Sequence, residues 1–119
     1  MLAPVRESLA NHEPIHWNRV YRLPWYVYFN HAVHIAKGVG CSTCHVRVDE
    51  MALTQQVAQL TMGWCVGCHR DPAPVLRPHD QIYNMSWQPA PKQAELGAEF
   101  MRVRHIDPRR LIECSVCHR

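Results

Sequence analysis

Apolar residues recur at a helical interval in two parts of the chain. The first part is "EMALTQQVAQLTM", in which Leu53, Val57 and Leu60 follow one another at steps of four and three residues. This spacing places the three side chains on one face of a helix. The sequence therefore predicts a helix over about 50 to 62, with Asp49 as its N-cap.

The second part is "PKQAELGAEFMRV", which predicts a helix from Pro91 to about Val103 that is weakened by Gly97. A last short helix is predicted to open at Pro108, with Asp107 as its cap. This helix is expected to carry the final cysteine motif, Cys114, Cys117 and His118.

The rest of the chain shows little periodicity. Residues 1 to 16 contain Pro4 and Pro14 and predict an extended arm, and Tyr26 to Phe29 predict a short strand. The proline-rich segment "DPAPVLRPHD" predicts a loop. Together these features predict one mostly α and irregular domain over residues 1 to 119, with short helices joined by long coil segments.

All 6 cysteines fall in three C-x-x-C-H motifs. The motifs are Cys41, Cys44, His45; Cys65, Cys68, His69; and Cys114, Cys117, His118. Such pairs fit a disulfide framework, zinc ligation or covalent haem attachment. The interval between Cys44 and Cys65 suits a zinc ribbon, but a zinc ribbon has no need of a histidine directly after each pair. Covalent attachment of haem c requires that histidine as an iron ligand, so the pattern favours three haems c.

Three haems change how the composition is interpreted. The chain offers about 40 residues per haem, too few for three cores made of protein alone, so the haems are expected to form the core. The 9 prolines and 5 glycines agree with a fold that needs little regular structure. Propionates and ferric iron of three haems contribute about −3, which offsets the formal charge of +3. Nucleic-acid binding has no support.

Arginine outnumbers lysine by 11 to 2. The arginine fork holds a carboxylate through two parallel bonds, and Arg47, Arg70 and Arg119 lie within two residues of a motif histidine. Pairing with haem propionates is one explanation. A codon preference for arginine is the other.

Each iron also needs a ligand on its distal side. Histidines outside the motifs outnumber the three distal positions, which favours six-coordinate irons that carry electrons. His31 and His34 are three residues apart and can serve two different irons. His105 precedes Cys114 by nine residues, close to the interval from His31 to Cys41, and is predicted as the third ligand. Weaker candidates are His12, His16, Met62, His79 and Met85.

The segment "FNHAVHIAKGVGCSTCH" resembles the F-x-H-x-x-H…C-x-x-C-H start of class III multihaem cytochromes c. Residues 15 to 72 are similar to the multihaem cytochrome subunit of alternative complex III, a quinol:electron-acceptor oxidoreductase. The resemblance implies that His31 ligates the haem on Cys41 and Cys44, and that His34 ligates a neighbouring iron. The chain departs from that family in two respects: Tyr21 stands where the family has a histidine, and three motifs stand where it has five.

The expected function is electron transfer through three covalent haems, without catalysis, as a subunit of a quinol-oxidising or related complex. The alternatives are an extracellular filament in which His12 or His16 ligates a haem of the next subunit, a free periplasmic shuttle, and a redox enzyme with one open haem. Redox proteins or other subunits are the expected partners.

Because haem c is attached outside the cytoplasm, a periplasmic or extracellular location is expected. Arg6 and Glu7 stand where the apolar part of a signal peptide would run, so none is predicted in the chain. No run approaches 18 apolar residues, and no membrane span is predicted.

Overall fold

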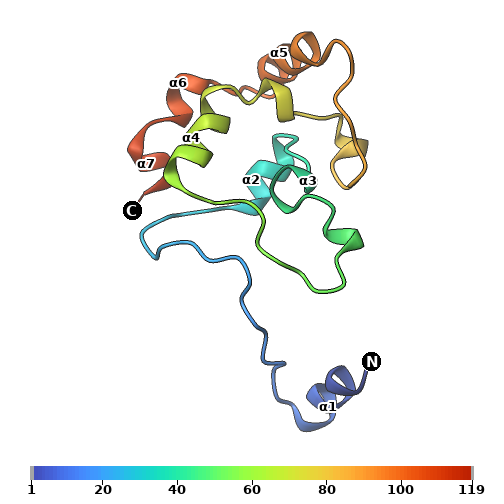
Figure 1. The fold of residues 1–119 in the computed structure, drawn as a ribbon. Helices are drawn as coiled ribbons and strands as arrows, with labels where there is room; N and C mark the ends of the chain where they lie inside the picture. Colours follow the sequence, from blue (N-terminus) through green and yellow to red (C-terminus); the bar gives the residue numbers. More distant parts are fainter. Residues whose placement is uncertain (1, 119) are drawn as a thin grey trace.

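The computed structural model describes residues 2–118, which form a mostly helical and irregular domain with short helices (Figure 1). Two isolated β-bridges are found in this part of the chain, and no strand. The predicted fold class is confirmed at this level. The helices in chain order are α1 (Ala3–Asn11), α2 (His31–Ala36), α3 (Ser42–His45), η1 (Val48–Glu50), α4 (Met62–Arg70), η2 (Ala73–Val75), η3 (His79–Gln81), α5 (Gln93–Val103), α6 (Pro108–Leu111) and α7 (Cys114–Cys117).

The N-terminal arm differs from its prediction, because its first part is the helix α1 rather than extended chain. Pro4 lies in the first turn, where a missing N–H costs nothing, and good helix formers follow it. The helix ends at His12, which adopts a left-handed conformation with φ 55°. Beyond it the chain runs to the body, and α1 lies well away from the other helices (Figure 1).

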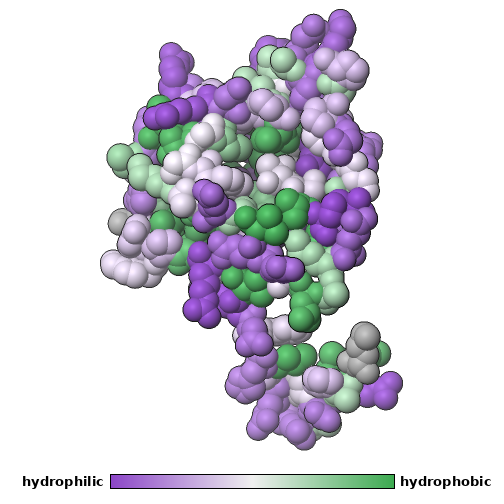
Figure 2. Space-filling view, in the orientation of Figure 1, coloured by the Kyte–Doolittle hydropathy of each residue, from purple (hydrophilic) through white to green (hydrophobic). Residues whose placement is uncertain are grey.

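The arm makes the molecule elongated. Its radius of gyration is 17.1 Å and its extents are 51 × 34 × 23 Å. A compact domain of this length has a radius of gyration of about 13.5 Å. The space-filling view shows apolar and polar residues mixed over the body and the arm below it (Figure 2).

The buried apolar core is small and lies in the segment predicted as a loop, residues 71 to 80, and just after it. The buried apolar side chains among the described residues are Ala73, Leu76 and Ile82. Helix α5 packs on η2, and the buried Gln93 amide donates to the carbonyls of Ala73 and Leu76 at 3.0 and 2.8 Å. A proline-rich segment without a long helix therefore forms the centre of the body.

The predicted helix over 91 to 103 is confirmed as α5, which begins two residues later at Gln93. Gly97 is buried where α5 meets η2, and a Cβ atom at this position would lie 2.2 Å from the Ala73 carbonyl oxygen. Because glycine has no side chain, α5 and η2 can approach this closely. The packing gained in this way outweighs the lower helix propensity of glycine.

The predicted helix over 50 to 62 is wrong. Only η1 forms there, and the chain is irregular from Met51 until α4 begins at Met62. Arg47 donates to both carboxylate oxygens of Asp49, at 2.9 and 2.8 Å, so Asp49 caps no helix. Leu53 is 82% exposed, because the apolar face that the spacing offers meets no partner surface.

The C-terminal prediction is confirmed in its first half. Asp107 accepts a hydrogen bond from the Arg109 N–H at 3.1 Å and caps α6, which opens at Pro108. The helix ends at Leu111, and the third motif lies on a separate helix, α7.

The predicted strand at Tyr26 to Phe29 is reduced to one bridge. Val27 pairs with His118, and the Tyr28 N–H donates to the Cys117 carbonyl at 2.7 Å. A single pair suffices to hold the third motif against this segment. It does not make a strand.

Candidate functional site

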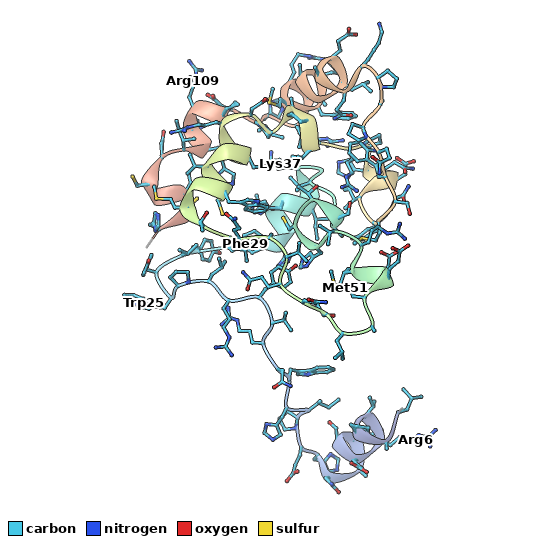
Figure 3. The ribbon with its side chains drawn as sticks, viewed as in Figure 1. Arg6, Trp25, Phe29, Lys37, Met51 and Arg109 are labelled. Atoms are coloured by element: carbon cyan, nitrogen blue, oxygen red, sulfur yellow. The ribbon has the colours of Figure 1, made fainter. Side chains whose placement is uncertain are left out.

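The three cysteine motifs lie at three different short helices, α3, α4 and α7, with Cys41 directly before α3 and His118 directly after α7. Helix α2 lies close to α3 (Figures 1 and 3). Within each motif the two cysteines are three residues apart, so helical geometry turns them to one side. All six thiols are free of disulfide bonds.

The first motif lies against His31. The ring centres of His31 and His45 are 6.3 Å apart, and their planes differ by 9°. Asn30 fixes the start of α2, because its side-chain oxygen accepts the Ala32 N–H at 2.9 Å. This cap places His31 at the first position of the helix.

The second motif lies against His34. The ring centres of His34 and His69 are 6.0 Å apart, with planes inclined by 33°. The Nδ1 of His34 bonds to the Asn30 carbonyl at 2.8 Å, and that of His69 to the Leu111 carbonyl at 3.0 Å. Since a carbonyl can only accept, each Nδ1 carries the proton. Each Nε2 is left with a free electron pair, as a metal ligand requires.

Two aromatic residues hold these imidazoles in place. Phe29 lies between the two α2 histidines, with its ring centre 4.7 Å from that of His31 and 4.6 Å from that of His34. Tyr21 packs edge-on against His45 at 4.7 Å and donates its hydroxyl to the Cys44 carbonyl at 3.3 Å. Tyr21 therefore positions the first motif, at the place where the resembling family has a histidine.

The ring-centre separations of the two imidazole pairs are compatible with one metal ion between the rings of each pair. A histidine nitrogen binds a transition metal at about 2.0–2.1 Å, and the ring centre lies roughly 1 Å further out, so two imidazoles on opposite sides of one metal have centres about 6 Å apart. The observed 6.3 and 6.0 Å match this requirement. One motif histidine belongs to each pair, so each pair can offer two imidazole ligands to one metal ion.

Burial also favours the neutral imidazole that a metal needs. Burial lowers the pKa of His34, against the hydrogen bond to Asn30, and the nearby His69 and His31 lower it further. Burial likewise lowers the pKa of His45, with a smaller contribution from His31. Both rings are therefore deprotonated at neutral pH more fully than a free histidine.

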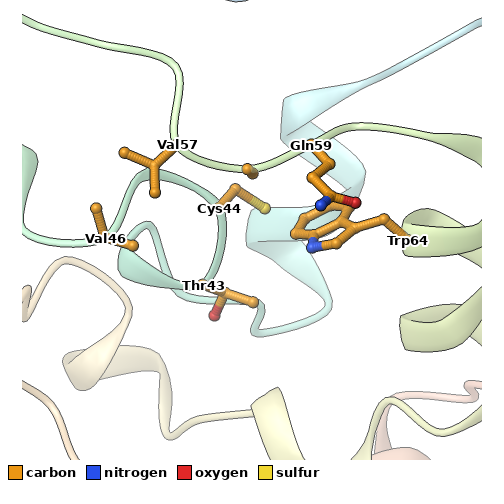
Figure 4. Close-up of a pocket in the computed structure, with 7 residues that line it drawn as sticks. Thr43, Cys44, Val46, Val57, Gln59 and Trp64 are labelled. Carbon is orange, nitrogen blue, oxygen red and sulfur yellow. The ribbon is translucent and has the colours of Figure 1, made fainter.

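The cysteines of the first two motifs lie in one neighbourhood. Burial raises the pKa of the Cys44 thiol to about 11, and the thiols of Cys68, Cys65 and Cys41 add to the rise. An open pocket of about 370 Å³ adjoins Cys44 and is bordered by Val57 and Trp64 (Figure 4). Apolar and aromatic walls beside an attachment cysteine suit a macrocycle edge.

The third motif has a different neighbour. The ring placed against His118 is that of Tyr26, with centres 5.8 Å apart and planes inclined by 26°. Cys117 Sγ lies 4.0 Å from the Nδ1 of His69, so the third motif adjoins the second. No imidazole pair like the first two is found for His118 among residues 2–118.

The predicted third ligand, His105, lies elsewhere. It follows α5 in a left-handed conformation with φ 52°, and its side chain is exposed. The weaker candidates are also mostly exposed: His12, His16, Met62 and His79 point to solvent, and Met85 is half-buried. The structure therefore brings together two of the three predicted distal histidines with motif histidines.

The pairing of arginines near the motif histidines with haem propionates stays a prediction. Arg47 is paired with Asp49 and Glu50, Arg70 is exposed, and Arg119 lies outside the described residues. The arginine that the structure buries beside a motif is Arg77, which is 2% exposed. No local pattern pointed to Arg77, because it lies in the proline-rich segment, 32 positions after His45.

Other positioning groups were also missed. Phe29 and Asn30 have a local signal, since an aromatic and a good N-cap directly precede His31. The Leu111 carbonyl has none, because a backbone oxygen 42 residues from His69 is selected only by the packing of α6 on α4.

No known protein family matches the chain, and no curated protein is similar enough to be matched with it. Within the described part, no three Cys, His, Asp or Glu side chains converge as a zinc site requires. None of the helices between residues 2 and 118 has the length and apolar character to cross a membrane.

Proposed function

We propose that this protein transfers electrons through three covalently bound haems c and catalyses no reaction itself. The observation that carries the proposal is the pairing of two motif histidines with His31 and His34 at distances that suit one iron each. Haem iron supplies a one-electron change between ferric and ferrous states when bound. At the first two haems, two imidazoles on one iron leave no position for a substrate, which favours a carrier over an enzyme at these haems.

The chain's own residues hold and tune the iron ligands. Hydrogen bonds from Nδ1 to the carbonyls of Asn30 and Leu111 fix the ring orientations of His34 and His69 and make these imidazoles stronger donors. His31 and His34 lie on adjacent positions of one short helix face, with Cβ atoms about 5–6 Å apart. Helix α2 thereby ties the first two haems into close contact, as fast electron transfer between them requires.

Within this proposal, the protein is an exported subunit of a quinol-oxidising or related complex, located in the periplasm or outside the cell. The resemblance of residues 15 to 72 supports this assignment. The exposed segment before α2 supports it as well, since Trp17 and Trp25 are 81% and 90% exposed and aromatic side chains are enriched at protein interfaces.

A subunit of a filament is the second candidate. It is favoured by one observation, the arm that carries the exposed His12 and His16 away from the body (Figure 1). A free shuttle needs no such arm. Size measurement of the purified protein distinguishes the candidates, since a filament sediments as a polymer and a shuttle as a monomer.

The test of haem attachment is the mass of the denatured protein, produced with its natural export and haem-ligation machinery. We expect the mass of the polypeptide plus three haems, retained after denaturation because thioether bonds are covalent. A mass equal to the polypeptide alone, or stoichiometric zinc in the purified protein, would refute the proposal.

The third haem is expected to differ from the other two. Because Tyr26 rather than an imidazole lies against His118, we expect carbon monoxide to bind one haem in three after reduction. His105→Ala should leave this fraction and the low-spin signals unchanged. Tyr26→Phe, which keeps the ring and removes the oxygen, should also leave carbon monoxide binding unchanged. If the His105 variant instead raises the fraction that binds, His105 is a ligand after all.

A further inference from the structure

We propose that the buried charge of Arg77 raises the reduction potential of the haem on Cys41 and Cys44 above that of the haem on Cys65 and Cys68. The inference rests on the proposed function, because it concerns two haems with the same pair of imidazole ligands. With equal ligands, the charges that surround each haem decide the order of potentials.

Arg77 is a buried cation whose partners are neutral. Its Nη2 donates to the Ser42 and Thr43 hydroxyls at 2.7 and 3.2 Å, and its Nη1 to the Asn84 carbonyl at 3.1 Å. The guanidinium carbon lies 4.4 Å from the centre of the Trp87 ring. None of the ion pairs formed by residues 2–118 includes Arg77, so no carboxylate cancels its charge.

The charge is fixed beside the first motif. Ser42 and Thr43 are the two residues between Cys41 and Cys44. The guanidinium also lies flat on Gly40, where a Cβ atom would be 2.1 Å from its carbon, so the glycine makes room for it. The Nε atom is buried without a hydrogen-bond partner.

Two further cations, Arg104 and Lys37, are hydrogen-bonded to the backbone next to Arg77. Arg104 donates to the Arg77 carbonyl at 2.9 Å and to the Lys37 carbonyl at 3.1 Å, while Lys37 donates to the Arg104 carbonyl. Backbone oxygens satisfy these donors, and no acidic side chain takes part. The region behind the first motif therefore carries an uncompensated positive charge.

Such a charge favours the reduced haem. A ferric porphyrin core has one more positive charge than a ferrous one, so a fixed cation destabilises the oxidised state. Hydrogen bonds from the guanidinium to the Ser42 and Thr43 hydroxyls, at 2.7 and 3.2 Å, place the charge within electrostatic range of the first motif. Burying an uncompensated cation is costly, which indicates a role beyond stability.

The second motif has exposed charges beside it, and among the described residues no buried cation adjoins it. Arg70 and Asp71 directly follow His69, and both are exposed. Their opposite charges offset each other, so the second haem lacks the fixed positive charge that lies beside the first. Because both side chains are exposed and screened by water, their effect is smaller than that of Arg77.

The test is a spectroelectrochemical titration of the complete haem-loaded protein. The haem on Cys41 and Cys44 is assigned as the one whose signal changes in His31→Ala. Arg77→Gln should shift its ferric–ferrous equilibrium roughly tenfold toward the ferric state, a fall of about 59 mV for one electron. Arg77→Lys keeps the charge and should keep the potential. Arg102→Gln, which removes an exposed arginine paired with Glu99 at 2.6 Å, should shift nothing.

A second pair of variants leaves Arg77 in place. Ser42→Asp puts a carboxylate next to the guanidinium and should lower the potential of the same haem, whereas the neutral Ser42→Asn should not. Equal shifts in Arg77→Lys and Arg77→Gln, or in both Ser42 variants, would overturn the proposal, because packing rather than charge would then set the potential. If the Arg77→Gln protein binds three haems with unshifted potentials, only the inference about Arg77 is refuted. If the unsubstituted protein lacks covalent haems, the proposed electron-transfer function is refuted.

Discussion

His34→Ala is expected to convert the haem on Cys65 and Cys68 from low-spin to high-spin, and His31→Ala to do the same to the haem on Cys41 and Cys44. Each substitution removes the imidazole that lies across from one motif histidine, at 6.0 Å from His69 or 6.3 Å from His45. The two variants should therefore affect different haems, although the substituted positions are only three residues apart.

The potential of the affected haem should rise in each case, because the lost imidazole had favoured the ferric state. Electron paramagnetic resonance counts the low-spin haems, and a redox titration shows which step has moved. The two variants should perturb different steps, and the double variant both. His79→Ala is the matched control, since this exposed histidine begins η3 and faces solvent.

A variant that leaves all haems low-spin would remove that histidine from the ligand set. Loss of the same signal in both variants would show that α2 serves one haem only. The ring distances would then reflect packing around Phe29, which contacts both histidines.

The chain produced without haem is expected to be largely unfolded. The buried apolar side chains among the described residues are Ala73, Leu76 and Ile82, and a fully buried leucine or isoleucine contributes about 1.5–3 kcal/mol. Fixing the backbone of one residue costs about 1–2 kcal/mol. The protein core alone is too small to order this chain, so the haems must supply most of the buried apolar surface.

This expectation is tested by expression in the cytoplasm, where haem is not attached, with all cysteines kept reduced. Circular dichroism should show little helix and no cooperative thermal transition, whereas the haem-loaded protein should unfold cooperatively. A haem-free chain that unfolds cooperatively near the temperature of the haem-loaded form would show that the haems are not the core.

Helix starts and the cysteine motifs could be predicted from the sequence. Asp107 and Pro108 mark the start of α6, and the segment after Pro91 forms α5, because capping and helix propensity act within a few residues. The C-x-x-C-H motifs are likewise local, since one helical turn brings their cysteines to one side. The 9 prolines and 5 glycines also agreed with an irregular fold.

The helical spacing of Leu53, Val57 and Leu60 predicted a helix that does not form. No surface covers this apolar face, so packing does not stabilise a helix there. The prediction for the N-terminal arm was wrong in the opposite direction. The arm was expected to be extended, but α1 forms there from local helix propensity with no surface to cover it. Neither outcome can be judged from the spacing of apolar residues alone.

The sequence by itself determined the chemistry of the candidate site: six cysteines in three motifs and an excess of histidines. The resemblance of residues 15 to 72 implied that His31 serves the first motif and His34 a neighbouring one, and only the tertiary structure decided that this neighbour contains His69 and that His105 faces solvent. The tertiary structure also decided the burial of Arg77 behind the first motif. Motif spacing is fixed within one helical turn, whereas these pairings depend on how distant segments pack, which no local pattern encodes.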